Sequence, residues 1–112
     1  MRDLKVLKEH YLKDGKEYNC YCLRGNVRGV DVRVQLLPPD IQGYTVLDIV
    51  FGEEEQADFI ATPFEFKADN GQVIAGHSYS VRSIGEQGEI YECKLIPAKS
   101  SDKTLIEMLL RA

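Results

Sequence analysis

Three cysteines and two histidines are the residues of this chain best suited to metal binding. Cys20 and Cys22 are two positions apart, so on a β-strand their thiols point to the same face. Together with Cys93 and with His10 or His77, they could supply four soft ligands to zinc. Structural zinc sites usually hold cysteines in Cys-x-x-Cys turns, however, and Cys-x-Cys within a strand is a weak signal. Because free cysteine is commonly a small buried hydrophobic residue, we expect no metal and no other cofactor.

Catalytic chemistry has little support in the residue pattern. Asp48 and Asp58 are candidate general bases, because a buried carboxylate can have a shifted pKa. His77 and Cys93, near Tyr79 on one strand face, resemble a base beside a nucleophile. Neither group is accompanied by a glycine-rich elbow or an evident oxyanion hole, and alternating strands assemble such trios by chance. We therefore expect a non-catalytic protein, with an enzyme as a minor alternative.

Length and composition predict one domain spanning residues 1–112, with an ordinary apolar fraction and a substantial core. The sequence shows no apolar run near the roughly 18 residues of a membrane span, so we expect no membrane partner. The first residues are too polar to open a secretory signal. An odd number of cysteines fits a reducing compartment, so we expect a cytoplasmic protein.

A basic first third contrasts with the net charge of −4. Residues 1–37 contain eight Lys or Arg and five Asp or Glu. Arg24 and Arg28 are predicted on one hairpin, with Lys5 beside them and Tyr11 further along the same face. Cations beside aromatic rings on a small sheet are typical of single-strand binders, which makes nucleic-acid binding our alternative hypothesis. The acidic total opposes it, since phosphate neutralisation supplies most non-specific affinity.

The candidate cysteines, histidines and arginines are expected to lie on β-strands. The alternation of apolar and polar residues that is typical of a strand is clearest around Val30–Leu36, where it runs without a break. Asp14-Gly15 and Arg28-Gly29 are expected to form tight hairpin turns on either side of the second strand. This choice of turns predicts the pairs Val6–Leu23, Val27–Val30, Leu23–Val34 and Tyr21–Leu36, in which apolar residues oppose each other.

Residues 44–51 are predicted to form a fourth strand that pairs back on the third. The register follows the apolar positions and predicts the pairs Val34–Leu47, Val32–Ile49 and Val30–Phe51. It also places Arg33 opposite Asp48, which we expect to form a structural ion pair.

Two further hairpins are predicted in the second half. Asn70-Gly71 is the strongest hairpin signal in the chain and predicts the pairs Phe64–His77, Thr62–Tyr79 and Ile60–Val81. The turn around residues 85–89 predicts the pairs Val81–Cys93, Tyr79–Leu95 and Arg82–Glu92. Pro63 indicates an edge strand, and a short helical turn over residues 54–59 is a competing interpretation.

The predicted fold is mainly β: a seven-stranded antiparallel meander, strongly curved or barrel-like, with one short C-terminal helix docked on the sheet. The strands are expected over residues 4–12, 18–27, 30–37, 44–51, 57–67, 73–84 and 90–96, and the helix over residues 102–111. The core is expected to contain Leu4, Val6, Tyr21, Leu23, Val27, Val30, Val32, Val34, Leu36, Leu47, Ile49, Phe51, Phe64, Phe66, Tyr79, Val81 and Leu95.

The sheet face opposite the core carries more apolar residues than a solvated face needs. We expect a patch formed by Leu37, Tyr44, Val46 and Tyr18 to be covered by the C-terminal helix or by a partner. The favoured hypothesis is therefore a small accessory domain that acts through protein contacts, with an unidentified protein or a second copy of the chain as its partner.

Overall fold

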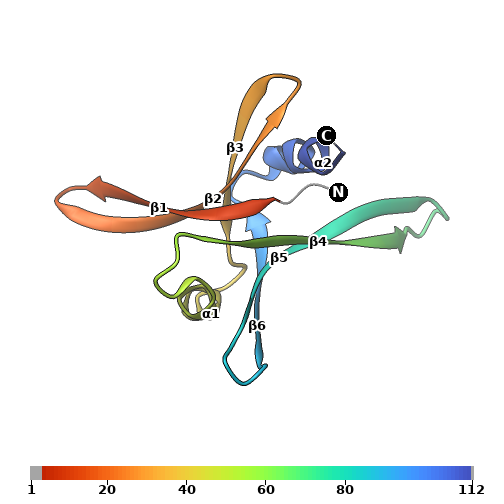
Figure 1. The fold of residues 1–112 in the computed structure, drawn as a ribbon. Coiled ribbons are helices and arrows are strands. Elements are labelled where there is room, and N and C mark those ends of the chain that lie inside the picture. The colour runs from red at the N-terminus through yellow and green to blue at the C-terminus, as the bar shows by residue number, and fades with distance from the viewer. Residues whose placement is uncertain (1–3, 112) are drawn as a thin grey trace.

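A computed structural model describes residues 4–111 of the protein, in which six antiparallel strands close into a barrel (Figure 1). The barrel order is β1-β2-β3-β6-β5-β4. Helix α1 lies between β3 and β4 in the chain, and a short 3-10 helix, η1, leads into the C-terminal helix α2. The bounds are β1 Lys5–Lys13, β2 Lys16–Val27, β3 Val30–Leu37, α1 Gln42–Phe51, β4 Gln56–Lys67, β5 Val73–Ile84, β6 Ile90–Pro97, η1 Ser100–Asp102 and α2 Lys103–Arg111.

The mainly β, antiparallel and barrel-like fold with a C-terminal helix is thus confirmed, with six strands in place of seven. Within residues 4–111, neither helix is long and apolar enough to cross a membrane.

The first three strands pair as predicted. Both turns have positive φ at their two central residues, 54° and 76° at Asp14-Gly15 and 52° and 84° at Arg28-Gly29. This is the type I′ geometry, whose twist matches that of the flanking strands. The observed pairs include Val6–Leu23, Val27–Val30, Leu23–Val34 and Tyr21–Leu36.

The predicted strand over residues 44–51 is wrong, because this segment forms α1. Its buried residues are Gly43, Leu47, Val50 and Phe51, a spacing of four, seven and eight positions that repeats with the helical period. At the start of the helix, the side chain of Asp40 accepts a hydrogen bond of 2.9 Å from the backbone N–H of Gly43.

As a helix, α1 packs against β6 and β5 rather than pairing with β3. The predicted pairs between residues 30–34 and 47–51 therefore do not form, and β3 pairs with β6 at that edge. Ile49, expected in the core, is 49% exposed.

The hairpin between β4 and β5 is shifted by one residue from the prediction. The backbone N–H of Ala68 donates to the carbonyl of Gln72 at 2.8 Å, and Gly71 has a φ of 85°. These features define a three-residue loop with a bulge, in place of a two-residue turn at Asn70-Gly71. The observed pairs are Phe59–Val81, Ala61–Tyr79 and Phe64–Gly76.

A shift of one residue turns every β4 side chain to the opposite face of the sheet. Phe64 and Phe66, both expected in the core, are therefore exposed, while Phe59 is buried and stacks on Tyr79 with ring centroids 5.5 Å apart. Because β4 already begins at Gln56, the alternative of a helical turn over residues 54–59 is also wrong.

The last hairpin confirms its predicted register, including Val81 opposite Cys93. Arg82 and Glu92 lie opposite each other and form an ion pair of 2.7 Å.

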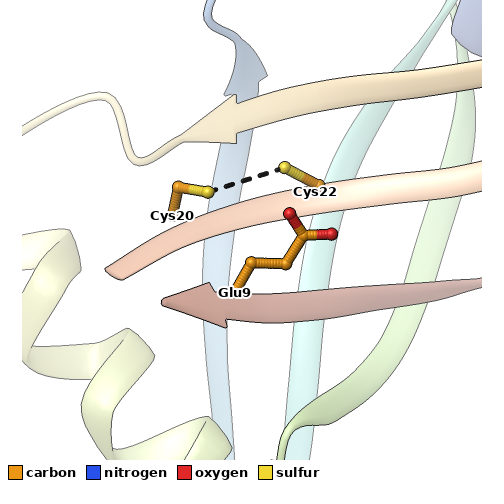
Figure 2. A group of neighbouring side chains, drawn as sticks. All are labelled: Glu9, Cys20 and Cys22. Atoms are coloured by element: carbon orange, nitrogen blue, oxygen red, sulfur yellow. Dashed lines mark hydrogen bonds between the residues drawn. The ribbon is translucent and has the colours of Figure 1, made fainter. Parts of the chain in front are cut away.

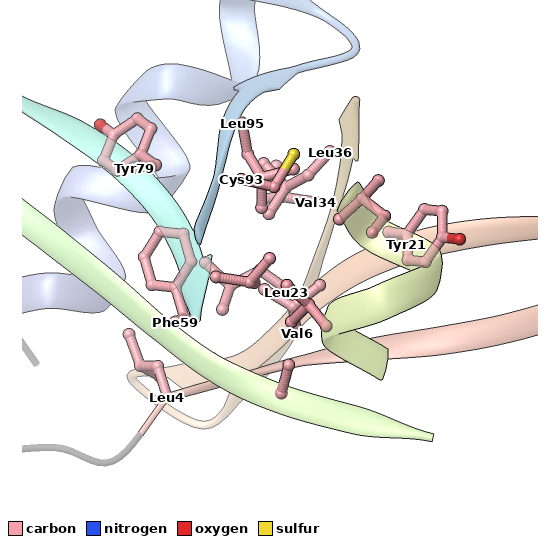
Figure 3. Close-up of a cluster of buried hydrophobic side chains, with 14 of the residues drawn as sticks. Leu4, Val6, Tyr21, Leu23, Val34, Leu36, Phe59, Tyr79, Cys93 and Leu95 are labelled. Carbon is pink, nitrogen blue, oxygen red and sulfur yellow. The ribbon is translucent and has the colours of Figure 1, made fainter. Parts of the chain in front are cut away.

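The core fills the barrel between the strands, as the buried side chains in Figure 3 show. Of the expected core residues, Val30 is exposed and Val27 and Val32 are only partly buried. Helix α2 adds Ile106 and Leu109, which are both fully buried, and it packs against β2 and β3. Eleven expected core residues are buried: Leu4, Val6, Tyr21, Leu23, Val34, Leu36, Leu47, Phe51, Tyr79, Val81 and Leu95.

Candidate functional site

The outer half of the β4–β5 hairpin projects from the barrel as a two-stranded arm, seen at the right of Figure 1. β1 pairs with β4 only at residues 56–58, and β6 pairs with β5 only at residues 79–84. Within the described part of the chain, residues 62–67 and 73–78 therefore have ladder partners only in each other. The radius of gyration of 15.3 Å exceeds the value of about 13 Å for a compact chain of this length, as projecting arms require.

One face of this arm is apolar. Phe64 and Phe66 of β4 lie on it, exposed by 47% and 58%, and Ile74 lies directly opposite Phe66 in β5 with 48% exposed. The ring of Phe64 covers Gly76, where an added Cβ would lie 3.1 Å from the ring. Apolar side chains that gather on one exposed face often mark an interaction site.

The predicted interaction patch is divided among three elements. Tyr44 and Val46 lie on α1, half-buried Leu37 ends β3, and Tyr18 lies on the β1–β2 hairpin, where it stacks on Tyr11. These residues therefore do not lie together on one outer face of the sheet, from which the patch was inferred.

Helix α2 does not cover the face that holds the cysteines of β2. Leu109 packs on Gly25, where a Cβ would lie 2.4 Å from its Cδ2 atom. Gly25 shares the inward face of β2 with Leu23, whereas Cys22 and Arg24 point to the opposite side.

The predicted ion pair between Arg33 and Asp48 is wrong, because the register that placed them together does not exist. Arg33 instead contacts Glu9, with Nη2 2.8 Å from Oε2, and Arg24 holds the other oxygen of the same carboxylate at 3.0 Å. Asp48 is exposed on α1, and its charge contributes, after burial, to a raised pKa of Tyr21.

The residues of the nucleic-acid hypothesis are not brought together. Lys5 forms an ion pair with Asp58 across β1 and β4, and Arg24 is held by Glu9. Arg28 lies at the β2–β3 turn, whereas Tyr11 lies near the far end of the β1–β2 hairpin. Nucleic-acid binding stays a prediction that no arrangement of these residues favours.

The four-ligand zinc set that was weighed and not favoured from the sequence is not assembled. His10 lies 3.2 Å from Glu17, and His77 lies 2.9 Å from Glu107. The thiol of Cys93 lies 3.5 Å from the carbonyl oxygen of Gly43 in α1, and burial raises its pKa.

The other two thiols, of Cys20 and Cys22, belong to a different group of possible metal ligands. Glu9, Cys20 and Cys22 converge on one face of β1 and β2, and their ligand atoms all lie within 4.8 Å of one another (Figure 2). Sequence reasoning missed Glu9, although the correctly predicted register of the first hairpin places it directly opposite Cys20. Burial, followed by the neighbouring Cys20, raises the pKa of Cys22 to about 12, so its thiol is protonated at neutral pH.

His77 and Tyr79 take part in a network that fastens α2 to β5. Tyr79 donates a hydrogen bond of 2.9 Å to Glu107. Burial alone would raise the pKa of Glu107, but the hydrogen bonds from Tyr79 and His77, together with the charges of His77 and Lys103, outweigh it and hold that pKa below its ordinary value. Burial and this hydrogen bond raise the pKa of Tyr79. A weakly basic carboxylate and a weakly acidic phenol suit a structural role better than proton transfer.

Comparison of this chain with protein-family models, curated proteins and solved structures found no match. The geometry of residues 4–111 is therefore the basis for inferring a function, and it offers two features: the apolar arm and the group of Glu9 with two thiols.

Proposed function

We propose that this protein is a small non-catalytic binding domain that acts through protein contacts, with the β4–β5 arm as its contact surface and a second copy of the chain as its partner. The observation that supports this most directly is the exposed apolar face formed by Phe64, Phe66 and Ile74. Phe64 and Phe66 were both expected in the core from the sequence, and each is about half exposed on the arm.

A partner that covers the arm would remove exposed apolar surface from water. Full burial of one large apolar side chain contributes roughly 1.5–3 kcal/mol, and the arm presents three that are about half exposed. A two-stranded ribbon is also only marginally stable in water unless a third layer or strand packs against it. A partner that covers the apolar face would supply that layer.

A second copy of the chain fits this surface because the apolar face can pack against itself. Two-fold symmetry places the same patch on both sides of an interface, so Phe64 of one copy would meet the apolar face of the other. The charged residues of the arm do not obstruct this packing, since Glu65 and Lys67 alternate with the phenylalanines and point to the opposite face.

Sedimentation equilibrium across micromolar to millimolar concentrations tests this proposal. We expect the wild-type chain to form a dimer and the double variant Phe64→Ser/Phe66→Ser to sediment as a monomer with an unchanged far-ultraviolet spectrum. Val30→Ser is the matched control, because Val30 is 64% exposed on another hairpin, and it should dimerise like the wild type. A wild-type chain that stays monomeric throughout, or a double variant that still dimerises, would refute the proposal.

A further inference from the structure

We propose that Glu9, Cys20 and Cys22 form a binding site for a soft divalent metal ion of the zinc class. The site lies on β1 and β2, away from the β4–β5 arm, and it is independent of the function proposed above (Figure 2). Its donor set is two thiol sulfurs and one carboxylate, a combination that favours zinc and cadmium over magnesium and calcium.

The two sulfurs already lie at the separation that one metal ion requires. The Sγ atoms of Cys20 and Cys22 are 3.9 Å apart. Two thiolates bound at about 2.3 Å to one tetrahedral zinc ion lie about 3.8 Å from each other. Metal binding therefore requires almost no movement of either side chain relative to the other.

The backbone ladder holds all three donors in place. Cys20 and Cys22 are two positions apart on β2, so both thiols point to the face away from the core side chains of that strand. Glu9 is directly opposite Cys20 in the β1–β2 ladder. Donors placed by regular strands are held more precisely than donors placed by a loop.

Two arginines orient the carboxylate without using up its capacity to bind a metal. Arg24 contacts Oε1 of Glu9 at 3.0 Å, and Arg33 contacts Oε2 at 2.8 Å. A carboxylate has about four lone-pair positions on its two oxygens, so lone pairs remain for a cation. Such outer partners are a common feature of metal sites, where they fix the ligand's orientation.

The positive and negative charges also nearly cancel when a divalent metal ion is bound, which leaves the site with a net charge of +1. Arg33 donates to the sulfur of Cys20 at 3.6 Å, so a guanidinium already lies beside one of the two sulfurs. When a divalent ion binds, the two thiols release their protons to solvent, and both sulfurs bond to the metal as thiolates. Two thiolates and one carboxylate then carry three negative charges, which the metal and the two arginines offset. The fourth coordination position is left to water or to another ligand.

The site is buried but lies next to solvent. Cys22 is fully buried and Cys20 is 9% exposed, while the side chain of Glu9 is 25% exposed. An ion can therefore approach past Glu9, and the bound metal would be largely shielded from water on the side of the sulfurs.

Titration of the reduced protein of residues 1–112 with Cd²⁺ tests the site, because cadmium–thiolate bonds produce an ultraviolet charge-transfer band. We expect a band that saturates at one Cd²⁺ per chain, is competed by Zn²⁺ and is unaffected by excess Mg²⁺. Cys20→Ser and Cys22→Ser should abolish the band. Arg33→Gln should weaken binding by roughly 10–100-fold, since it removes one of the groups that orient Glu9.

Cys93→Ser is the matched control, because it removes the third buried thiol and leaves the site intact. It should keep the band and the one-to-one stoichiometry. Absence of a band in the wild type, or a band that survives in Cys20→Ser, would overturn the proposal.

A second measurement on the wild type does not depend on variants that fold poorly. Alkylation of the thiols, followed residue by residue with mass spectrometry, should slow at Cys20 and Cys22 when Zn²⁺ is added and stay unchanged at Cys93. If Cys20 reacts in the absence of Zn²⁺ and its alkylation rate is unchanged when Zn²⁺ is added, the site is also refuted.

Discussion

The contact between β2 and α2 predicts a specific coupling between two substitutions. A Cβ placed on Gly25 would lie 2.4 Å from Cδ2 of Leu109, far inside van der Waals contact. Leu109 is fully buried, so its side chain has little room to move away. Gly25→Ala should therefore overpack the interface, and Leu109→Ala should remove the atom against which the new methyl group collides.

The expected magnitudes follow from packing. Overpacking a core typically lowers the free energy of unfolding by about 1–3 kcal/mol, and replacing a strand glycine by alanine recovers roughly 0.5–1 kcal/mol of backbone entropy. Gly25→Ala should therefore destabilise by about 0.5–2 kcal/mol. Leu109→Ala should destabilise by about 2–5 kcal/mol, since it removes buried methyl groups and leaves a cavity.

The double variant Gly25→Ala/Leu109→Ala should be more stable than the sum of the single effects indicates, because the methyl group introduced on β2 enters the space that the leucine side chain leaves. We expect a coupling of at least about 0.5 kcal/mol. Equilibrium unfolding in urea measures it, and thermal unfolding provides a second measure at roughly 4 °C per kcal/mol for a chain of this size.

Gly25→Ala combined with Leu47→Ala is the control pair, because Leu47 lies on α1, which packs on β5 and β6. These two effects should add. If the Gly25 and Leu109 effects also add within error, the close contact between β2 and α2 is wrong.

Two further predictions concern charged groups. The pKa of Glu107 is lowered in the folded protein, so its ionised form stabilises the fold above the ordinary carboxyl pKa, and this stabilisation is lost as pH falls through the lowered value. In urea unfolding between neutral and acidic pH, Glu107→Gln should be destabilised at pH 7 and should show a weaker loss of stability on acidification; an unchanged pH dependence would contradict the network with Tyr79. Fluorescence anisotropy with labelled single-stranded oligonucleotides should show no salt-sensitive binding, because the ion pair with Glu9 already neutralises the charge of Arg24 that would contact a phosphate. Binding that weakens steeply with salt and disappears in Arg24→Glu would instead favour the nucleic-acid hypothesis.

The sequence by itself determined the first three strands and the last hairpin. Asp14-Gly15 and Arg28-Gly29 accept the positive φ of type I′ turns, and a strict alternation of apolar residues leaves one register that places them opposite each other on one face. Both signals are local, so they can be read from neighbouring residues. The same hairpin register already placed Glu9 opposite Cys20.

The tertiary structure decided whether residues 42–51 form a strand or a helix. Leu47 and Phe51 fit an inward face in both arrangements, since they are four positions apart. Ile49 and Val50 distinguish the helix from the strand, because the helix buries Val50 and exposes Ile49. Which one is buried depends on the surface that the segment meets, here β5 and β6, and this surface is distant in sequence.

The tertiary structure also decided the faces of β4. A two-residue turn at Asn70-Gly71 and a three-residue loop with a bulge both use Gly71, but they place opposite sides of β4 toward the core. The loop that forms allows Phe59 to stack on Tyr79 inside the barrel. Local turn propensity could not predict this choice, because the difference lies in packing between strands, and the same packing leaves Phe64 and Phe66 exposed on the arm.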